Sequence, residues 1–180
     1  MHNLLTRVNN LSALLSSCLM GLVAVIALSS FLIEANMAAP KGVVSILAIK
    51  SAPAKTPHFR VRHQDVTFTK FNITADLSTL FHWNTKQVFV YLQAEYNNTQ
   101  GVHNEVVIWD KIIHSKDEAR LSLVDKHKYA FRELSTSFEN IEPASYALKY
   151  NVMPYVGLLT YGEAARSEEP VAFPEVKTLQ

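Results

Sequence analysis

Residues 86–96 read KQVFVYLQAEY, an alternation of hydrophobic and polar side chains that decides the fold. A period of two predicts a β-strand with one buried face. That face is expected to hold Val88, Val90, Leu92, Ala94 and Tyr96. The opposite face carries Gln87, Gln93 and Glu95 together with the aromatic residues Phe89 and Tyr91. Because exposed aromatic rings gain free energy when they leave water, we expect a second sheet or a partner subunit to cover Phe89 and Tyr91.

A second alternating run at residues 105–113 follows the turn-forming sequence NNTQG at 97–101, which predicts a hairpin. Its faces are expected to hold Val107, Trp109 and Ile113 on one side and Val106, Ile108 and Ile112 on the other. Further strands are predicted at 43–49, 66–75, 121–124 and 146–153, and helical turns only at 77–81 and 117–120. Several short strands at this spacing predict an all-β, sandwich-like domain.

Three connecting features complete the expected domain. The apolar pattern changes face between Phe68 and Phe71, which predicts a β-bulge or a bend in that strand. Residues 51–57 read SAPAKTP and are expected to form an extended connector. Residues 163–180 contain Pro170 and Pro174 and are expected to form a loosely attached tail.

The N-terminal residues 11–33 form an apolar segment with no charged residue and no proline. As a helix these residues would extend about 34 Å, enough to cross a hydrocarbon core of about 30 Å. Serine hydroxyls in the segment can bond back to helix carbonyls, which lowers the cost of burying them in lipid. A cleavable signal peptide cut near residues 27–29 is the alternative, but the apolar run exceeds the usual length of such peptides. The sequence therefore predicts a single uncleaved transmembrane helix, a signal anchor.

The orientation of this helix rests on sequence features outside it. Arg7 on one side is nearly balanced by Lys41 and Lys50 on the other. Two N-x-Thr sequons, at Asn72 and Asn97, favour a lumenal position for residues 34–180 and a cytosolic tail of residues 1–10. Asn97 falls in a predicted turn and is the better glycosylation acceptor, because Asn72 falls in a predicted strand.

The composition excludes several functional classes. The formal net charge is +1, with no basic run, which argues against binding nucleic acid. Cys18 is the single cysteine, so the chain has no internal disulfide and no cysteine-based metal site. No metal-ligand spacing links the histidines His58, His63, His82, His103, His114 and His127. With no recognisable nucleophile motif either, we expect no catalytic residues, no cofactor and no metal.

Several motifs in order along the chain resemble the third subunit of the eukaryotic signal peptidase complex. They are Leu5, Arg7, Asn9 and Leu11, then FNITADL from Phe71, FHWNTKQVFVYL from Phe81, AEY from Ala94, VVIWDKII from Val106 and NVMPYVG from Asn151. The resemblance implies a single-pass type II protein of the endoplasmic reticulum membrane with a lumenal β-sandwich domain. It further implies a non-catalytic accessory subunit whose partners are the catalytic subunit, other small membrane subunits and the lipid bilayer.

Two other functions remain open from the sequence. One is a membrane-anchored β-sandwich module of the secretory pathway that recognises a peptide or glycan through the face of Phe89 and Tyr91. The other is an anchored hydrolase whose site is assembled from distant strands. Binding by the isolated domain would favour the first alternative, and turnover by the purified chain would favour the second.

Overall fold

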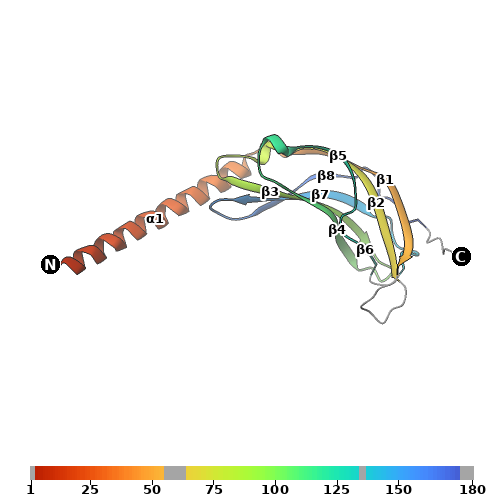
Figure 1. Ribbon diagram of the computed structural model, residues 1–180, viewed down its shortest axis with the longest axis horizontal. Coiled ribbons are helices and arrows are strands. Elements are labelled where there is room, and N and C mark those ends of the chain that lie inside the picture. Colours follow the sequence, from red (N-terminus) through yellow and green to blue (C-terminus); the bar gives the residue numbers. More distant parts are fainter. Residues whose placement is uncertain (1–2, 55–63, 134–136, 175–180) are drawn as a thin grey trace.

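The computed structural model describes residues 3–54, 64–133 and 137–174. One long helix, α1 (Leu4–Ala35), projects from one end of a domain built of strands (Figure 1). The helix begins earlier and ends later than the predicted segment, and its length and composition suffice to cross a membrane. The hydroxyls of Ser17 and Ser29 donate to the carbonyls of Ala13 and Ile26 at 3.0 and 2.9 Å, as expected for serines within an apolar helix.

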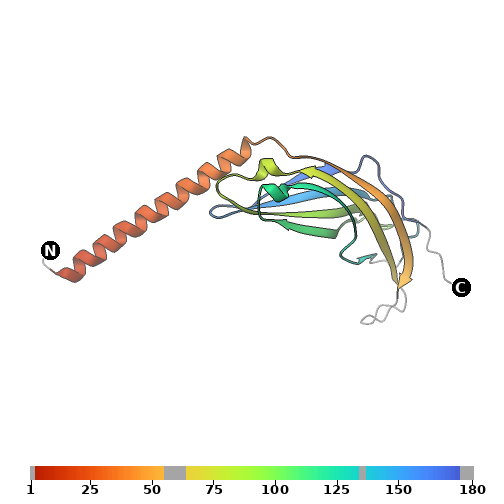
Figure 2. The same ribbon diagram turned by 45° about the horizontal axis from the view of Figure 1, so that its top comes forward.

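The strands form two antiparallel sheets, which confirms the predicted all-β domain behind one helix. The first sheet contains β1 (Lys41–Ala54), β2 (Gln64–Asp76) and β5 (Arg120–Lys126) in that order, with β6 (Phe131–Arg132) also paired to β2. The second sheet has the order β4 (His103–Ile113), β3 (Thr85–Asn97), β7 (Ser145–Pro154) and β8 (Thr160–Arg166). The predicted helical turns are the 3-10 helices η1 (Ser78–Leu80) and η2 (Asp117–Ala119). Figure 2 shows α1 continuing away from the stacked sheets.

The core lies between the two sheets. The apolar side chains of β3 predicted to be buried are buried, namely Val88, Val90, Leu92, Ala94 and Tyr96. Thr85 and Gln93 of the same strand are buried as well, although Gln93 was predicted on the opposite face. The apolar side chains pack against Phe71 and Ile73 of β2, which are fully buried. Each aliphatic or aromatic side chain buried in this way contributes about 1.5–3 kcal/mol. The close approach of the sheets near α1 requires a glycine at position 42, because a Cβ there would lie 2.8 Å from the Cβ of Ala75 and 3.2 Å from that of Ala165.

The irregularity predicted between Phe68 and Phe71 lies opposite these residues, in the partner strand β1, and not in β2 itself. Thr67 and Thr69 of β2 point inward beside Phe71, while Phe68 lies on the outer face, so the period of two continues unbroken. The register of β1 against β2 shifts between Ile46 and Ala48 instead. The sequence pattern missed this alternation because threonine occupies two of the inward positions and was not counted as apolar.

The predicted alternation along β4 also fails at one point. Leu92 of β3 pairs with Trp109 of β4, but the next residue, Gln93, pairs with Val107. The register of the two strands therefore shifts by one residue. The additional residue, Ile108, is buried together with Trp109. A bulge changes which side chains face inward, so Ile108 and Trp109 both enter the core.

The connector and the tail are more ordered than predicted. Residues 51–54 extend β1 and pair with the start of β2, whereas residues 55–57 lie outside the described residues. Residues 163–166 belong to β8, which pairs with β7. Beyond β8, Val171 bridges to Ala144, and the ring of Phe173 stacks on that of Phe138 with 4.7 Å between centroids. The prediction of a loose tail was therefore wrong for residues 163–173.

Candidate partner-binding face

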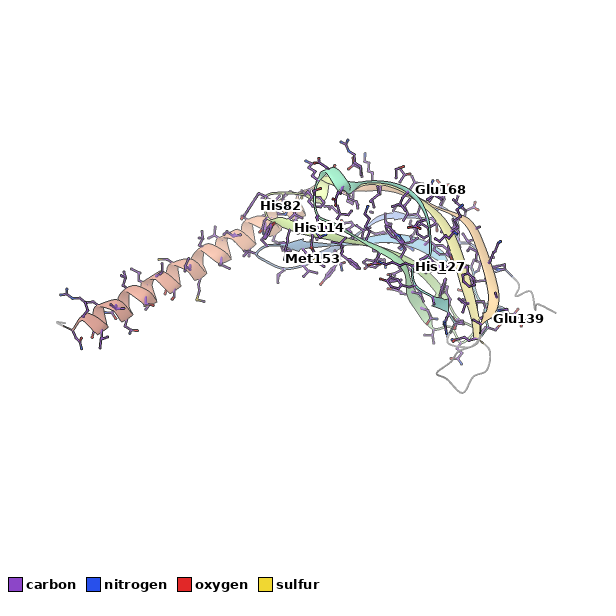
Figure 3. All side chains as sticks on the ribbon, in the orientation of Figure 1. His82, His114, His127, Glu139, Met153 and Glu168 are labelled. Atoms are coloured by element: carbon purple, nitrogen blue, oxygen red, sulfur yellow. The ribbon has the colours of Figure 1, made fainter. Side chains whose placement is uncertain are left out.

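The described histidines do not converge on one site. His82, His114 and His127 come from separate segments (Figure 3). His82 bonds to Glu34 of α1, and the ring of His127 packs edge-on against Phe68. Within residues 3–54, 64–133 and 137–174, no group of three or more His, Cys, Asp or Glu could hold a metal ion. His58 and His63 lie outside these ranges, so the expectation of no metal stays a prediction.

The outer face of the second sheet carries an aromatic patch in the half nearest α1. Phe89 and Tyr91 of β3 are half-buried there, and their rings stack with 5.5 Å between centroids. Phe89 is flanked by Ile112 of β4 and by Asn151 of β7, and Asn151 pairs in turn with Tyr161 of β8. Ile112 is 43% exposed and Tyr161 is 74% exposed. We call Phe89, Tyr91, Ile112 and Tyr161 the aromatic patch.

The other half of the same face is charged. Glu95 of β3 contacts the ammonium of Lys149 at 2.7 Å and the guanidinium of Arg166 at 2.6 Å. Arg166 also contacts Glu163 at 2.7 Å, so the network joins β3, β7 and β8. Burial acts to raise the pKa of Glu95, but hydrogen bonds from Arg166 and Lys149 outweigh it and lower that pKa to about 2. The face thus combines an aromatic half beside α1 with a charged half at the far end.

The Glu95 network should make stability depend on pH. Since the pKa of Glu95 falls from 4.5 to about 2 on folding, its contribution is complete above pH 4.5 and is lost as pH falls toward 2. We expect Glu95→Gln to lower the free energy of unfolding by about 1–3 kcal/mol at neutral pH and to flatten its acid dependence. Urea unfolding of the full chain in detergent micelles, at neutral and at acid pH, measures both. The exposed Glu168→Gln is the control, and an equal acid dependence in the two variants would contradict the prediction.

The two sequons occupy different places. Asn72 lies within β2, between Ser45 of β1 and Val124 of β5, as predicted for a strand residue. Asn97 is the last residue of β3 rather than part of the turn, and its amide nitrogen donates to a carboxylate oxygen of Glu142 at 2.7 Å. The turn begins at Asn98, whose carbonyl accepts from the amide of Gly101. Use of either sequon stays a prediction.

A second feature, the junction between α1 and the domain, holds buried polar side chains. Glu34 of α1 accepts from Thr160 at 2.7 Å and bonds to His82 at 3.1 Å. The side-chain amide of Asn84 donates to the hydroxyl of Ser30 at 2.9 Å and to the carbonyl of Val156 at 2.6 Å. These contacts fasten the last two turns of α1 to the loops that precede β3 and β8.

Sequence reasoning placed Phe89 and Tyr91 on the outer face but missed the junction. Thr160 and Glu34 are 126 positions apart, and nothing local to either residue signals the contact. Ile112 and Tyr161 join the patch only through the pairing of four strands. The one available signal was the position of Glu34, the first charge after a long apolar run, which had to find a partner.

Comparison with known proteins gives concordant matches. A family model described as "Signal peptidase subunit" matches residues 1–176. Among curated proteins, the chain is similar to signal peptidase complex subunit 3 of Saccharomyces cerevisiae, with 50% identity over 95 residues that cover 52% of each chain. The Homo sapiens protein of the same name is 42% identical over 96 residues, or 53% of each chain. These alignments span about half the length of the relatives.

The protein of the same name from Caenorhabditis elegans aligns over nearly its whole length. It is 31% identical over 179 residues, which cover 99% of this chain and 97% of that protein. Both this alignment and the family model include the helix as well as the two sheets. The resemblance stated from the motifs is confirmed, and the chain belongs to the signal peptidase subunit family.

Proposed function

We propose that this chain is a non-catalytic accessory subunit of the signal peptidase complex in the endoplasmic reticulum membrane. In this proposal α1 anchors the chain in type II orientation, with residues 1–10 in the cytosol and the two-sheet domain in the lumen. The domain binds and positions the catalytic subunit while that subunit removes signal peptides from nascent secretory proteins. Family membership and the names of the relatives support the assignment to this complex.

The aromatic patch is the main observation that supports a role in binding another subunit. An exposed apolar patch on a sheet face is typical of a protein interface, and aromatic side chains supply most of the binding energy at such interfaces. Phe89 and Tyr91 form its half-buried centre, whereas Ile112 and Tyr161 extend outward around them. The charged half beside the patch provides a polar surround that can set the orientation of a partner.

The surroundings of the ionisable groups with shifted pKa values support a structural role rather than catalysis. Glu95 is paired with Arg166 and Lys149, and a hydrogen bond from Lys128 lowers the pKa of Asp110. Burial raises the pKa of Tyr96, whose hydroxyl donates to the buried Glu133. Each of these shifts follows from an ion pair or from core packing, which is the usual alternative to an active site.

Co-purification tests the proposal. The full chain carries a tag, microsomes are solubilised in mild detergent, and the eluate is assayed for cleavage of a secretory precursor. We expect the eluate to contain a serine protease subunit and to cleave the precursor, and the chain purified alone to be inactive. If the tagged chain elutes alone and without cleavage, the proposal fails and the peptide- or glycan-binding module takes its place.

A further inference from the structure

We propose that the domain itself contacts lipid through the loops at its α1 end, with Trp83, Tyr155 and Leu158 inserted into the headgroup region. We call these three residues the membrane rim. The rim lies on the side of the membrane that carries the domain, next to the last two turns of α1. This inference concerns the bilayer and is independent of which protein the aromatic patch binds.

The depth of the loop between β7 and β8 is set by its contact with α1. A Cβ added at Gly157 would lie 3.6 Å from the Cα of Ala27, so this loop packs directly on the helix there. Ala27 is seven residues before Glu34, which corresponds to about 10 Å along the helix axis. Each interfacial region of a bilayer is only about 5–8 Å thick. Even with the carboxylate of Glu34 at the outer limit of the interface, a loop packed about 10 Å deeper reaches through the headgroups to the edge of the hydrocarbon core.

The exposed side chains on these loops are those that membrane interfaces favour. Trp83 is 60% exposed, Tyr155 is 68% exposed and Leu158 is 80% exposed. Tryptophan and tyrosine gather at the headgroup level because their rings are apolar and their polar atoms can still reach water. Residues 77–85 and 153–162, which include both loops, contain no Asp, Glu, Lys or Arg. The rim therefore presents apolar and aromatic surface to lipid without the cost of inserting a charge.

The polar groups behind the rim are already bonded within the protein. The backbone N–H of Val156 donates to the side-chain carbonyl of Asn84 at 3.2 Å, and the carbonyl of Val156 accepts from the same side chain. The N–H of Tyr155 donates to the backbone carbonyl of Asn84 at 2.8 Å. Because unpaired backbone groups are costly at membrane depth, this bonding suits loops that leave water. Asn84, itself buried, thereby prepares the loop for lipid contact.

Quenching of tryptophan fluorescence by brominated lipid tests the proposal. The full chain has two tryptophans: Trp83 on the rim, and Trp109, which is buried and donates to Asp125. The chain is reconstituted in phosphatidylcholine vesicles whose acyl chains are either unmodified or brominated close to the headgroup. We expect the brominated lipid to reduce the Trp83 emission about twofold, as for a ring at headgroup level. In Trp83→Phe the remaining Trp109 emission should not change.

Matched variants in the Trp83→Phe background show where quenching occurs. We expect Tyr155→Trp to be quenched as Trp83 is. Val102→Trp, at the exposed turn on the far end of the domain, should be unquenched because β3 places it about 40 Å away. Leu19→Trp within α1 confirms insertion through quenching by lipid brominated near the bilayer centre. If Leu19→Trp is quenched while Trp83 and Tyr155→Trp are not, the domain stands clear of the bilayer and the proposal is overturned.

Discussion

We expect at least about tenfold less catalytic subunit to co-purify with the double variant Ile112→Glu/Tyr161→Glu than with the unmodified chain. The loss of one interface hot spot costs about 2 kcal/mol or more of binding free energy. Both side chains are exposed in the single chain, so the substitutions leave the core intact. In the complex they would place two carboxylates against apolar surface without a partner, which adds a desolvation cost. Quantitative immunoblotting of tagged chain purified from microsomes measures the effect, with cleavage of a secretory precursor as a second readout.

The first sheet offers a control of the same chemistry. Val43 and Val124 are exposed on its outer face, at the opposite side of the domain from the aromatic patch. We expect Val43→Glu/Val124→Glu to recover the catalytic subunit normally, and Tyr161→Phe to do so as well because it keeps the ring. Equal losses in both double variants would show that the patch is not the docking surface.

Phe131→Ala is expected to lower the free energy of unfolding by about 3–5 kcal/mol, the usual cost of deleting a fully buried phenylalanine ring. Phe131 is fully buried, and its ring contacts those of Tyr96, Phe138 and Phe173 at centroid distances of 5.6, 5.3 and 5.7 Å. Removal of the ring would leave a cavity under the C-terminal segment and weaken its attachment. Urea unfolding of the full chain in detergent micelles measures the loss, in a Trp83→Phe background so that the emission comes from Trp109.

A phenylalanine on the outside of the same sheet supplies the comparison. Phe68 of β2 is exposed and has its ring contact with His127 on the outer face. We expect Phe68→Ala to cost less than about 1 kcal/mol, because it creates no internal cavity. If the two variants lose similar stability, the aromatic cluster around Phe131 does not hold the C-terminal segment in place.

The sequence was sufficient for elements whose side chains signal their own burial. The alternation along β3 predicted both faces of that strand, and the apolar run predicted the helix. β8 was missed because Ala164 and Ala165 are too small to produce a recognisable pattern, although both are buried. The small size of Ala165 suits the close approach of the two sheets at Gly42. Such a strand depends on tertiary pairing with β7, which a local pattern cannot reveal.

The residues of the candidate site also separate into those that the sequence could predict and those that it could not. Phe89 and Tyr91 could be predicted to lie together on the outer face because they follow each other at a spacing of two. Ile112 and Tyr161 became their neighbours through cross-strand register, and the bulge at Ile108 altered that register within β4. The buried contacts of Asn84 with Ser30 and Val156 join three segments that are remote in sequence. Register and remote contacts were therefore the parts that needed the structure.

In the proposed orientation, the junction of Ser30, Glu34 and Asn84 would also determine how far above the membrane the domain can bind a partner. The junction attaches the start of β3, at Thr85, to the helix. The distance of a β3 residue from Thr85 along the strand is therefore the largest height above the junction at which that residue can lie. Phe89 is about 13 Å and Tyr91 about 20 Å from Thr85 along the strand. In the proposed complex, a chain built in this way would act as a spacer of fixed length and would select partners whose complementary surface stands within about two nanometres of the bilayer.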